Sequence, residues 1–215
     1  GPAILAAAAE AHDIPLVHVS TDYVFDGPSV RAWREDDPIH PLGVYGRSKA
    51  AGEEAVRQAS ARHFILRTAW LFGAHGANFV KTILALAAER DTLDMVADKR
   101  GSPTATADLA HAIFLTEAAS RTGSAVLGTY HVAGEGTASR YEQAAAVVDA
   151  QAAITGRRPT VRPVASDAFP TAAVRPAYSE LDSAKFEATF GFRPAPWRVA
   201  VARTVSKILA GEAAA

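Results

Sequence analysis

The sequence of 215 residues predicts an α/β protein with a largely parallel sheet. Short β-branched runs, such as residues 14–20, are typical of strands buried on both faces. Other segments, such as residues 78–90, place apolar side chains near 3.6-residue spacing and are typical of amphipathic helices. The two kinds of segment alternate along the first 120 residues. Helices that connect parallel strands produce this alternation.

The first five elements follow from local patterns. Residues 2–12 are rich in alanine and carry Pro2 in the first turn, which predicts a helix. Residues 14–20 predict a buried strand, and the polar, proline-bearing residues 26–42 predict a loop. A helix is expected over residues 44–61, followed by a strand at residues 63–68.

The middle of the chain repeats this order. The strongly periodic residues 78–90 predict a helix, and residues 92–97 predict a strand. Residues 106–120 predict a second amphipathic helix. A strand at residues 128–132 and a helix at residues 141–154 follow.

The texture changes toward the end of the chain. Residues 158–176 are rich in proline and predict an irregular segment. Two short helices are expected at residues 183–190 and 197–209. We therefore expect residues 1–122 to form the main domain and residues 123–215 to form mainly a smaller lobe over a cleft, with segments that interleave.

Composition excludes several classes of protein. The chain has 22 basic and 23 acidic residues without a basic block, so nucleic acid is not an expected partner. The absence of cysteine excludes disulfides, thiolate zinc sites and a cysteine nucleophile. The seven scattered histidines predict no metal site. No apolar run approaches the roughly 20 residues of a membrane span, so a cytoplasmic protein with no membrane partner is expected.

Three residues point to proton transfer. Thr21 follows the strand at residues 14–20, and ligands of open parallel sheets bind at the carboxyl ends of strands. Tyr45 and Lys49 are four residues apart in a predicted helix, so they share one face. A phenol beside an ammonium group can protonate a carbonyl oxygen during its reduction, and the Thr21 hydroxyl would hold the same oxygen.

The chemistry of this pair depends on its surroundings. A free phenol has a pKa of about 10, so proton transfer near neutral pH requires a change of about three units, or roughly 4 kcal/mol. A cation at about 4 Å supplies that energy at an effective dielectric constant near 20, but only about 1 kcal/mol in bulk water. We therefore expect the pair to lie in a cleft that excludes water. A cationic nicotinamide would add to the effect.

Seven segments, in order along nearly the whole chain, carry a family resemblance: VHVSTDYVFDG (17–27), PLGVYGRSKAAGE (41–53), LRTAWLFG (66–73), NFVKTILALA (78–87), GSPTATADLA (101–110), GTYHVAGEGTASRYEQA (128–144) and VRPAYSELDSAKF (174–186). They resemble the extended short-chain dehydrogenase/reductases and, within them, the dTDP-4-dehydrorhamnose reductases. The resemblance implies a doubly wound, Rossmann-like sheet and a C-terminal substrate-binding lobe. It also implies NADPH-dependent reduction of the C4 ketone of dTDP-4-dehydro-L-rhamnose to dTDP-L-rhamnose, with NADH as an alternative reductant and a homodimer as an assembly compatible with the sequence.

The resemblance also implies roles for single residues. Tyr45 would donate the proton, Lys49 would favour the ionised phenol and hold the nicotinamide ribose, and Thr21 would polarise the ketone. Thr21, Asp22 and Trp70 match positions that contact the dTDP-sugar substrate in the family. Asn78 and Arg175 are candidates to contact the substrate or its diphosphate.

Three alternatives are weighed against this reading. Related sugar-nucleotide dehydratases carry Thr-Asp-Glu, whereas Asp22 is followed here by Tyr23, which favours simple reduction over dehydration. A non-catalytic relative is the second alternative, since the regulatory subunit of methionine adenosyltransferase resembles the same family. The third is a reductase or epimerase of another nucleotide deoxysugar.

The sequence departs from the family pattern in two places. The glycine-rich phosphate loop that opens a dinucleotide-binding domain is absent. We expect the first half of the doubly wound domain, roughly 80 residues, to be missing before Gly1. Residues 134–139 imitate such a loop, but we interpret them as a turn in which Ser139 caps the next helix. Lys99 stands where the family usually has glutamine.

Overall fold

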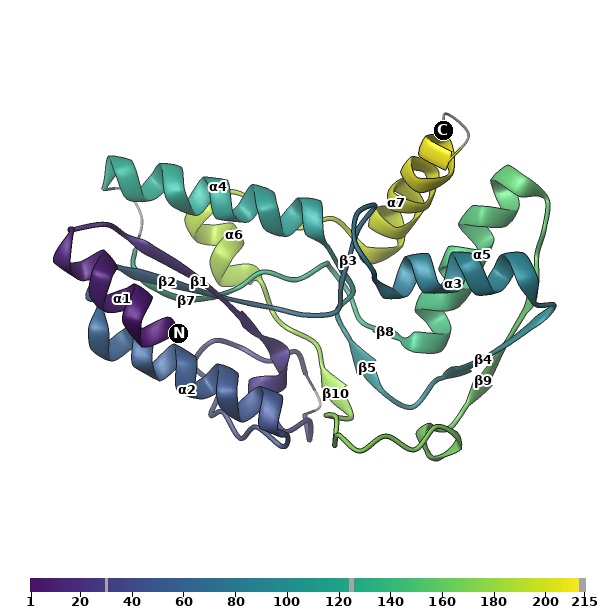
Figure 1. The fold of residues 1–215 in the computed structure, drawn as a ribbon, viewed down its shortest axis with the longest axis horizontal. Helices are drawn as coiled ribbons and strands as arrows, with labels where there is room; N and C mark the ends of the chain where they lie inside the picture. Colours follow the sequence, from purple (N-terminus) through teal and green to yellow (C-terminus); the bar gives the residue numbers. More distant parts are fainter. Residues whose placement is uncertain (30, 124–125, 213–215) are drawn as a thin grey trace.

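The computed structural model describes residues 1–29, 31–123 and 126–212 (Figure 1). Within these residues the helices are α1 (Pro2–Ala11), α2 (Val44–Ala59), α3 (Phe79–Glu89), α4 (Thr106–Thr122), α5 (Arg140–Thr155), α6 (Ala184–Phe190) and α7 (Trp197–Glu212), with 3-10 turns η1 (Asp22–Val24) and η2 (Ser166–Ala168). The strands are β1 (Leu16–Thr21), β2 (His63–Thr68), β3 (Leu71–Phe72), β4 (Thr92–Val96), β5 (Arg100–Gly101), β6 (Thr104–Ala105), β7 (Gly128–His131), β8 (Ala138–Ser139), β9 (Thr160–Val164) and β10 (Tyr178–Ser179).

A parallel sheet in the order β1-β2-β7 forms one half of the molecule. Helices α1 and α2 cover one face, and α4 and α6 cover the other (Figure 1). Phe64 and Leu66 of β2 face the α4 and α6 side, whereas Ile65 packs with Ala6 and Val56 on the α1 and α2 side. Burial on both faces explains the continuous apolar run of β2 and confirms the predicted doubly wound α/β fold.

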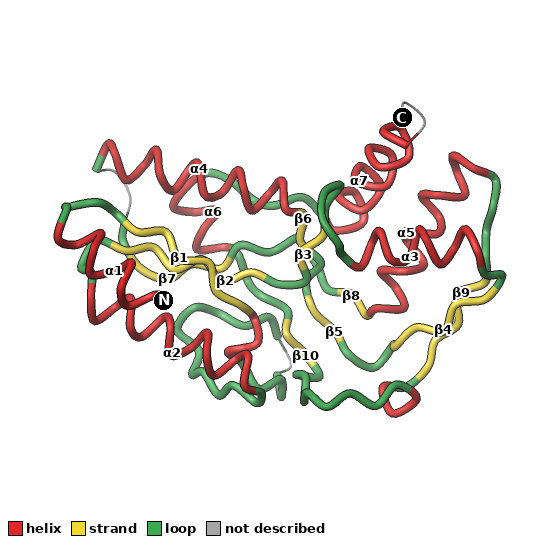
Figure 2. Tube along the Cα trace, in the orientation of Figure 1, coloured by secondary structure: helices red, strands yellow, loops and turns green. Residues whose placement is uncertain are grey.

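The other half of the molecule is built on α3, α5 and α7 and on the parallel pair β4 and β9 (Figure 2). One apolar core joins these elements, with Val80, Ile83, Val147, Val201 and Val205 fully buried in it. Helix α5 begins with a capping box, in which Ser139 and Glu142 each accept a hydrogen bond from the other's backbone N–H. The predicted capping role of Ser139 is confirmed.

The predicted irregular segment at residues 158–176 is partly wrong, because it contains β9. This strand pairs with β4 in register from Thr92 opposite Thr160 to Val96 opposite Val164. Pro163 lies within it, which an edge strand tolerates because one side of its backbone needs no partner. The proline content therefore led to the prediction of a loop where the structure has a strand.

Two-residue strands hold the two halves together. The short strands β10, β5 and β8 lie between the two halves of the molecule (Figure 2), where they form a mixed sheet. None was predicted, because two residues are too few to show a periodicity. They position the segments that line the main cavity of the described chain.

The chain passes between the two halves several times. Strand β7 follows residue 122 yet pairs with β2, and α3 precedes residue 122 yet packs against α5. The domain boundary at residue 122 stays a prediction. No helix in the described ranges has the length and apolar character needed to cross a membrane.

Candidate active site

The carboxyl end of β1 turns directly into η1. Thr21 caps this turn, since its hydroxyl oxygen accepts a hydrogen bond from the backbone N–H of Tyr23 at 3.2 Å. The same hydroxyl donates to Asp22 Oδ1 at 3.0 Å. Thr21 and Asp22 are 6% and 2% exposed, so both side chains are fixed within the protein at the strand end.

Asp22 is a carboxyl group in an unfavourable place for its charge. Burial raises its pKa to about 6, and the hydroxyls of Ser179 and Thr21 and the Arg140 charge only partly oppose this rise. Near neutral pH the group is therefore close to its titration point, unlike an exposed aspartate.

Helix α2 approaches the same strand end. Gly46 makes the approach close, because a Cβ at this position would lie 2.2 Å from the Tyr23 carbonyl oxygen. The Lys49 ammonium group donates to the Val19 carbonyl oxygen at 2.6 Å, which ties α2 to β1 two residues before Thr21. The Tyr45 ring meets the Tyr23 ring edge-on, with centroids 6.0 Å apart. The structure thus brings Tyr45, Lys49 and Thr21 to one edge of the sheet.

The surroundings of Tyr45 differ from the expected water-excluding cleft. Tyr45 is 56% exposed, although Gly46 next to it in the first turn of α2 is buried. Helical spacing sets which face Tyr45 and Lys49 share, but it does not determine what covers that face. The described residues alone leave the phenol in contact with solvent.

Trp70 lies beyond the end of β2 in a strained conformation. Its φ of +44° is in the left-handed region, which is uncommon for a large side chain and is concentrated at functional sites. Its indole packs against Gly101, where an added Cβ would lie 2.5 Å from Trp70 Cε2. The Arg140 guanidinium covers the Trp70 ring, 3.8 Å from its centroid.

A cavity of about 630 Å³ opens beside Trp70. Its wall includes the predicted substrate residues Trp70 and Arg175, as well as Lys99. Tyr23 also lines this cavity and touches Tyr45, so the cavity adjoins the sheet edge that carries the three proton-transfer residues. A ligand that extends from one to the other would pass over Tyr23.

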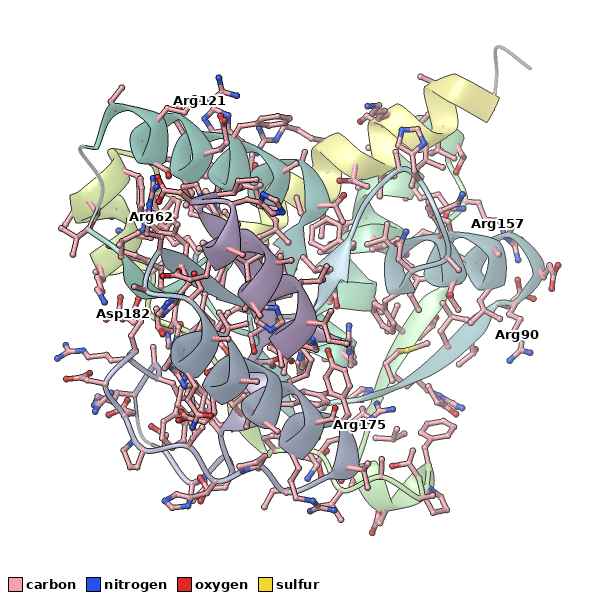
Figure 3. All side chains as sticks on the ribbon, turned by 60° about the vertical axis from the view of Figure 1, so that its left-hand side comes forward. Arg62, Arg90, Arg121, Arg157, Arg175 and Asp182 are labelled. Carbon is pink, nitrogen blue, oxygen red and sulfur yellow. The ribbon has the colours of Figure 1, made fainter. Side chains whose placement is uncertain are left out.

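Arg175 and Asn78 occupy different settings. Arg175 is exposed on a segment that lies beside the start of α2 (Figure 3). The contact is close, because a Cβ added to Gly43 would lie 3.5 Å from the Val174 carbonyl oxygen. The Asn78 side chain caps α3 by accepting from Lys81 N at 3.3 Å, and its amide donates to Gly73 O at 2.8 Å. Asn78 is not among the residues that line the cavity.

The sequence analysis missed Arg140, whose guanidinium lies in the cavity wall between two aromatic rings. One signal was available. A cation in the first turn of a helix opposes the helix dipole, so an arginine directly after the Ser139 cap is unfavourable unless it has another role.

The residues at the sheet edge fit a nicotinamide cofactor. Tyr45 is exposed, and the Thr68 hydroxyl at the end of β2 is buried without a hydrogen-bond partner among the described residues. Thr68 pairs with Thr21 across the sheet, so both polar groups face the strand ends where dinucleotides bind. Among these residues no group of three or more metal-ligating side chains is assembled.

Comparison with known proteins identifies the family. Residues 1–210 match the RmlD substrate binding domain. The chain belongs to this family of dTDP-4-dehydrorhamnose reductases. A dTDP-4-dehydrorhamnose reductase of Aggregatibacter actinomycetemcomitans is 43% identical over 204 residues, which are 94% of this chain and 69% of the relative.

Solved structures of the family agree. The reductase of Clostridium acetobutylicum superposes with a TM-score of 0.89 at 35% identity, over 97% of this chain and 71% of that one. The reductase of Bacillus anthracis, solved in complex with NADP, gives a TM-score of 0.87 at 34% identity, over 96% and 70% of the two chains. The predicted family and fold class are confirmed, whereas the roles of individual residues stay predictions.

Proposed function

We propose that this chain reduces the C4 ketone of dTDP-4-dehydro-L-rhamnose to dTDP-L-rhamnose with NADPH as the reductant. The observation that carries the proposal, in a member of this family, is that α2 lies against the end of β1 that carries Thr21: Lys49 bonds to Val19 O and Tyr45 contacts Tyr23. The names of the relatives supply the substrate, and the NADP complex of the Bacillus anthracis enzyme supports the cofactor.

NADPH supplies a hydride to the C4 carbon, and the remaining steps belong to this chain. Tyr45 gives a proton to the ketone oxygen as that oxygen gains negative charge. The Thr21 hydroxyl is held at the end of β1; when substrate binds, it turns its single proton from Asp22 Oδ1 to the same ketone oxygen and fixes the position of that oxygen. Lys49 is anchored on Val19 O, so its positive charge stays beside α2 and favours the phenolate that Tyr45 leaves behind.

Proton transfer by Tyr45 requires that water be excluded, and the described residues alone do not exclude it. Because Tyr45 is 56% exposed, the attraction between its phenolate and Lys49 is weakened by solvent. A nicotinamide ring packed against the phenol would displace that water. Cofactor binding therefore both delivers the hydride and strengthens the proton donor.

Asp22 followed by Tyr23 favours reduction over dehydration. A dehydratase of this fold needs a second acidic group beside Asp22, and Tyr23 supplies a ring that packs against Tyr45 instead. We further propose a cytoplasmic location and assembly as a homodimer, with neither nucleic acid nor membrane as a partner.

The proposal is tested by measuring NADPH oxidation. If the gene encodes the family's glycine-rich segment, the protein used in the assay should include it. Oxidation is expected only when a dTDP-4-keto sugar is supplied. Tyr45→Phe should lower the rate about 10²- to 10⁴-fold, the usual contribution of a positioned proton donor, while NADPH binding is retained. Tyr141→Phe, which changes a tyrosine outside the main cavity, is the matched control.

The alternatives give different results. Full activity of Tyr45→Phe would contradict the assigned role. A non-catalytic binding subunit would oxidise no NADPH with any dTDP-4-keto sugar. A reductase of another deoxysugar would prefer a different 4-keto sugar over the rhamnose precursor.

A further inference from the structure

Arg140 forms no ion pair with any residue that the structure describes, although the buried Asp22 lies near enough for the two groups to affect each other's pKa. Its guanidinium donates to the neutral amide oxygen of Gln143 at 2.8 Å, and no carboxylate of the described residues lies within ion-pairing distance. Burial, together with the nearby Arg175 charge, lowers its pKa to about 10, and Tyr23 and Asp22 only partly oppose this change. Its position at the first residue of α5 also opposes the helix dipole. Each of these effects costs stability, which suggests that the charge serves a ligand.

Two aromatic rings hold this cation in place. The guanidinium carbon lies 3.8 Å from the centroid of Trp70 and 4.6 Å from that of Phe79. Stacking fixes the plane of an arginine while leaving its edge free to donate hydrogen bonds. The side chain is therefore ordered before a ligand arrives.

The rest of the cavity wall has a positive balance of charge, because Lys99 and Arg175 join Arg140 there, against the two carboxylates of Asp94 and Asp167. Neither Lys99 nor Arg175 forms an ion pair with any residue that the structure describes. Asp94 also lines the cavity, but its carboxylate is engaged by two hydrogen bonds from Arg162, at 2.7 and 2.9 Å. The cations that remain without partners favour an anionic ligand in this cavity.

We propose that Arg140, stacked between Trp70 and Phe79, binds the diphosphate of the nucleotide substrate and sets the preference for a nucleoside diphosphate over a nucleoside. Lys99 and Arg175 add to the positive field of the cavity. The planar donor edge of Arg140 matches two phosphate oxygens, as a lysine at this position would not. The proposal rests on the proposed function, since it assigns a receptor for part of the same substrate.

Calorimetric titration with dTDP and with thymidine tests the assignment. The unmodified chain should bind dTDP more tightly than thymidine. Arg140→Gln should weaken dTDP binding about 10- to 100-fold, the range expected when a charge-assisted hydrogen-bond pair is lost, and leave thymidine binding unchanged. The control Arg158→Gln removes an exposed arginine that pairs with Asp149 outside the main cavity and should change neither affinity.

Several results would overturn the assignment. Equal weakening of both ligands would mean that Arg140 acts only by supporting Trp70. Unchanged dTDP binding, or displacement of dTDP by NADPH, would place the diphosphate elsewhere or assign the cations to the cofactor. If Arg140→Gln does not fold, Arg140→Lys decides, because loss of the planar fork should still reduce the preference for dTDP.

The outcome is separable from that of the proposed function. The ratio of dTDP to thymidine affinity requires no hydride transfer and can be measured with Tyr45→Phe in place. Loss of NADPH oxidation with an intact ratio would contradict the reductase and leave the diphosphate site standing. Normal NADPH oxidation by Arg140→Gln with an unchanged ratio of the two affinities would support the reductase and contradict the diphosphate site.

Discussion

Asp22 offers the sharpest test of the electrostatics at the site. Its carboxyl group is 2% exposed, and burial raises its pKa from 3.8 to about 6 in the folded protein. The folded state therefore holds this proton more tightly than the unfolded state does. Above pH 6 the ionised group destabilises the fold by about 3 kcal/mol, because its pKa differs by about 2 units between the folded and unfolded states. The destabilisation diminishes as the pH falls through 6 and vanishes below 3.8.

Asp22→Asn should consequently stabilise the protein at pH 7. Asparagine keeps the Oδ1 that accepts from Thr21 and removes the charge. We expect the free energy of unfolding to rise by up to about 3 kcal/mol at pH 7.5 but by only about 1 kcal/mol at pH 4.5. Urea denaturation followed by tryptophan fluorescence across this range measures both values. A difference that does not vary with pH would refute the reasoning, as would a destabilised variant at pH 7.5. Loss of NADPH oxidation in this more stable variant would show that the charge is retained for function.

Two further perturbations test how the sheet edge is built. Gly46→Ala would place a Cβ 2.2 Å from the Tyr23 carbonyl oxygen, so α2 must shift; we expect about 1–3 kcal/mol of destabilisation by urea denaturation, with a lower rate of NADPH oxidation. Arg67→Met would remove the two hydrogen bonds, of 2.8 and 2.9 Å, that the fully buried Glu53 accepts from Arg67, and would leave the partly exposed Arg57 as its ion-pair partner among the described residues. A loss of about 3–5 kcal/mol is expected, and the double variant with Glu53→Leu should recover part of it. Equal stability of the single and double variants would contradict the second expectation.

Much of the fold could be predicted from local pattern. The strand at residues 63–68 coincides with β2, and the helix at residues 78–90 differs from α3 by one residue at each end. Both have a strong periodicity or a continuous apolar run, because each packs against a large core. The strand β9 was not predicted because Pro163 within it is typical of a loop, and the two-residue strands are too short to show a periodicity.

The site was predictable where one element carried it. Helical spacing predicted that Tyr45 and Lys49 share one face, and the position of Thr21 at the end of a strand predicted that it lies where parallel sheets bind ligands. The Trp70, Phe79 and Arg140 stack joins residues from three distant segments, and no local pattern encodes that meeting. Only the unfavourable charge at the start of α5 distinguished Arg140 in the sequence.

The surroundings of Arg140 and those of Tyr45 differ in how many of the groups needed for their proposed roles the described residues supply. Around Arg140 the aromatic rings and the cations are already assembled, so the geometry needed for an anion exists before binding. Around Tyr45 the partners are in place but the phenol is 56% exposed, and the attraction of Lys49 for its phenolate is weak as long as water surrounds it. If Arg140 and Tyr45 have the roles proposed above, binding of the substrate through its diphosphate does not require the cofactor, whereas efficient proton transfer by Tyr45 does. Such an order would couple the strength of the proton donor to the presence of the hydride.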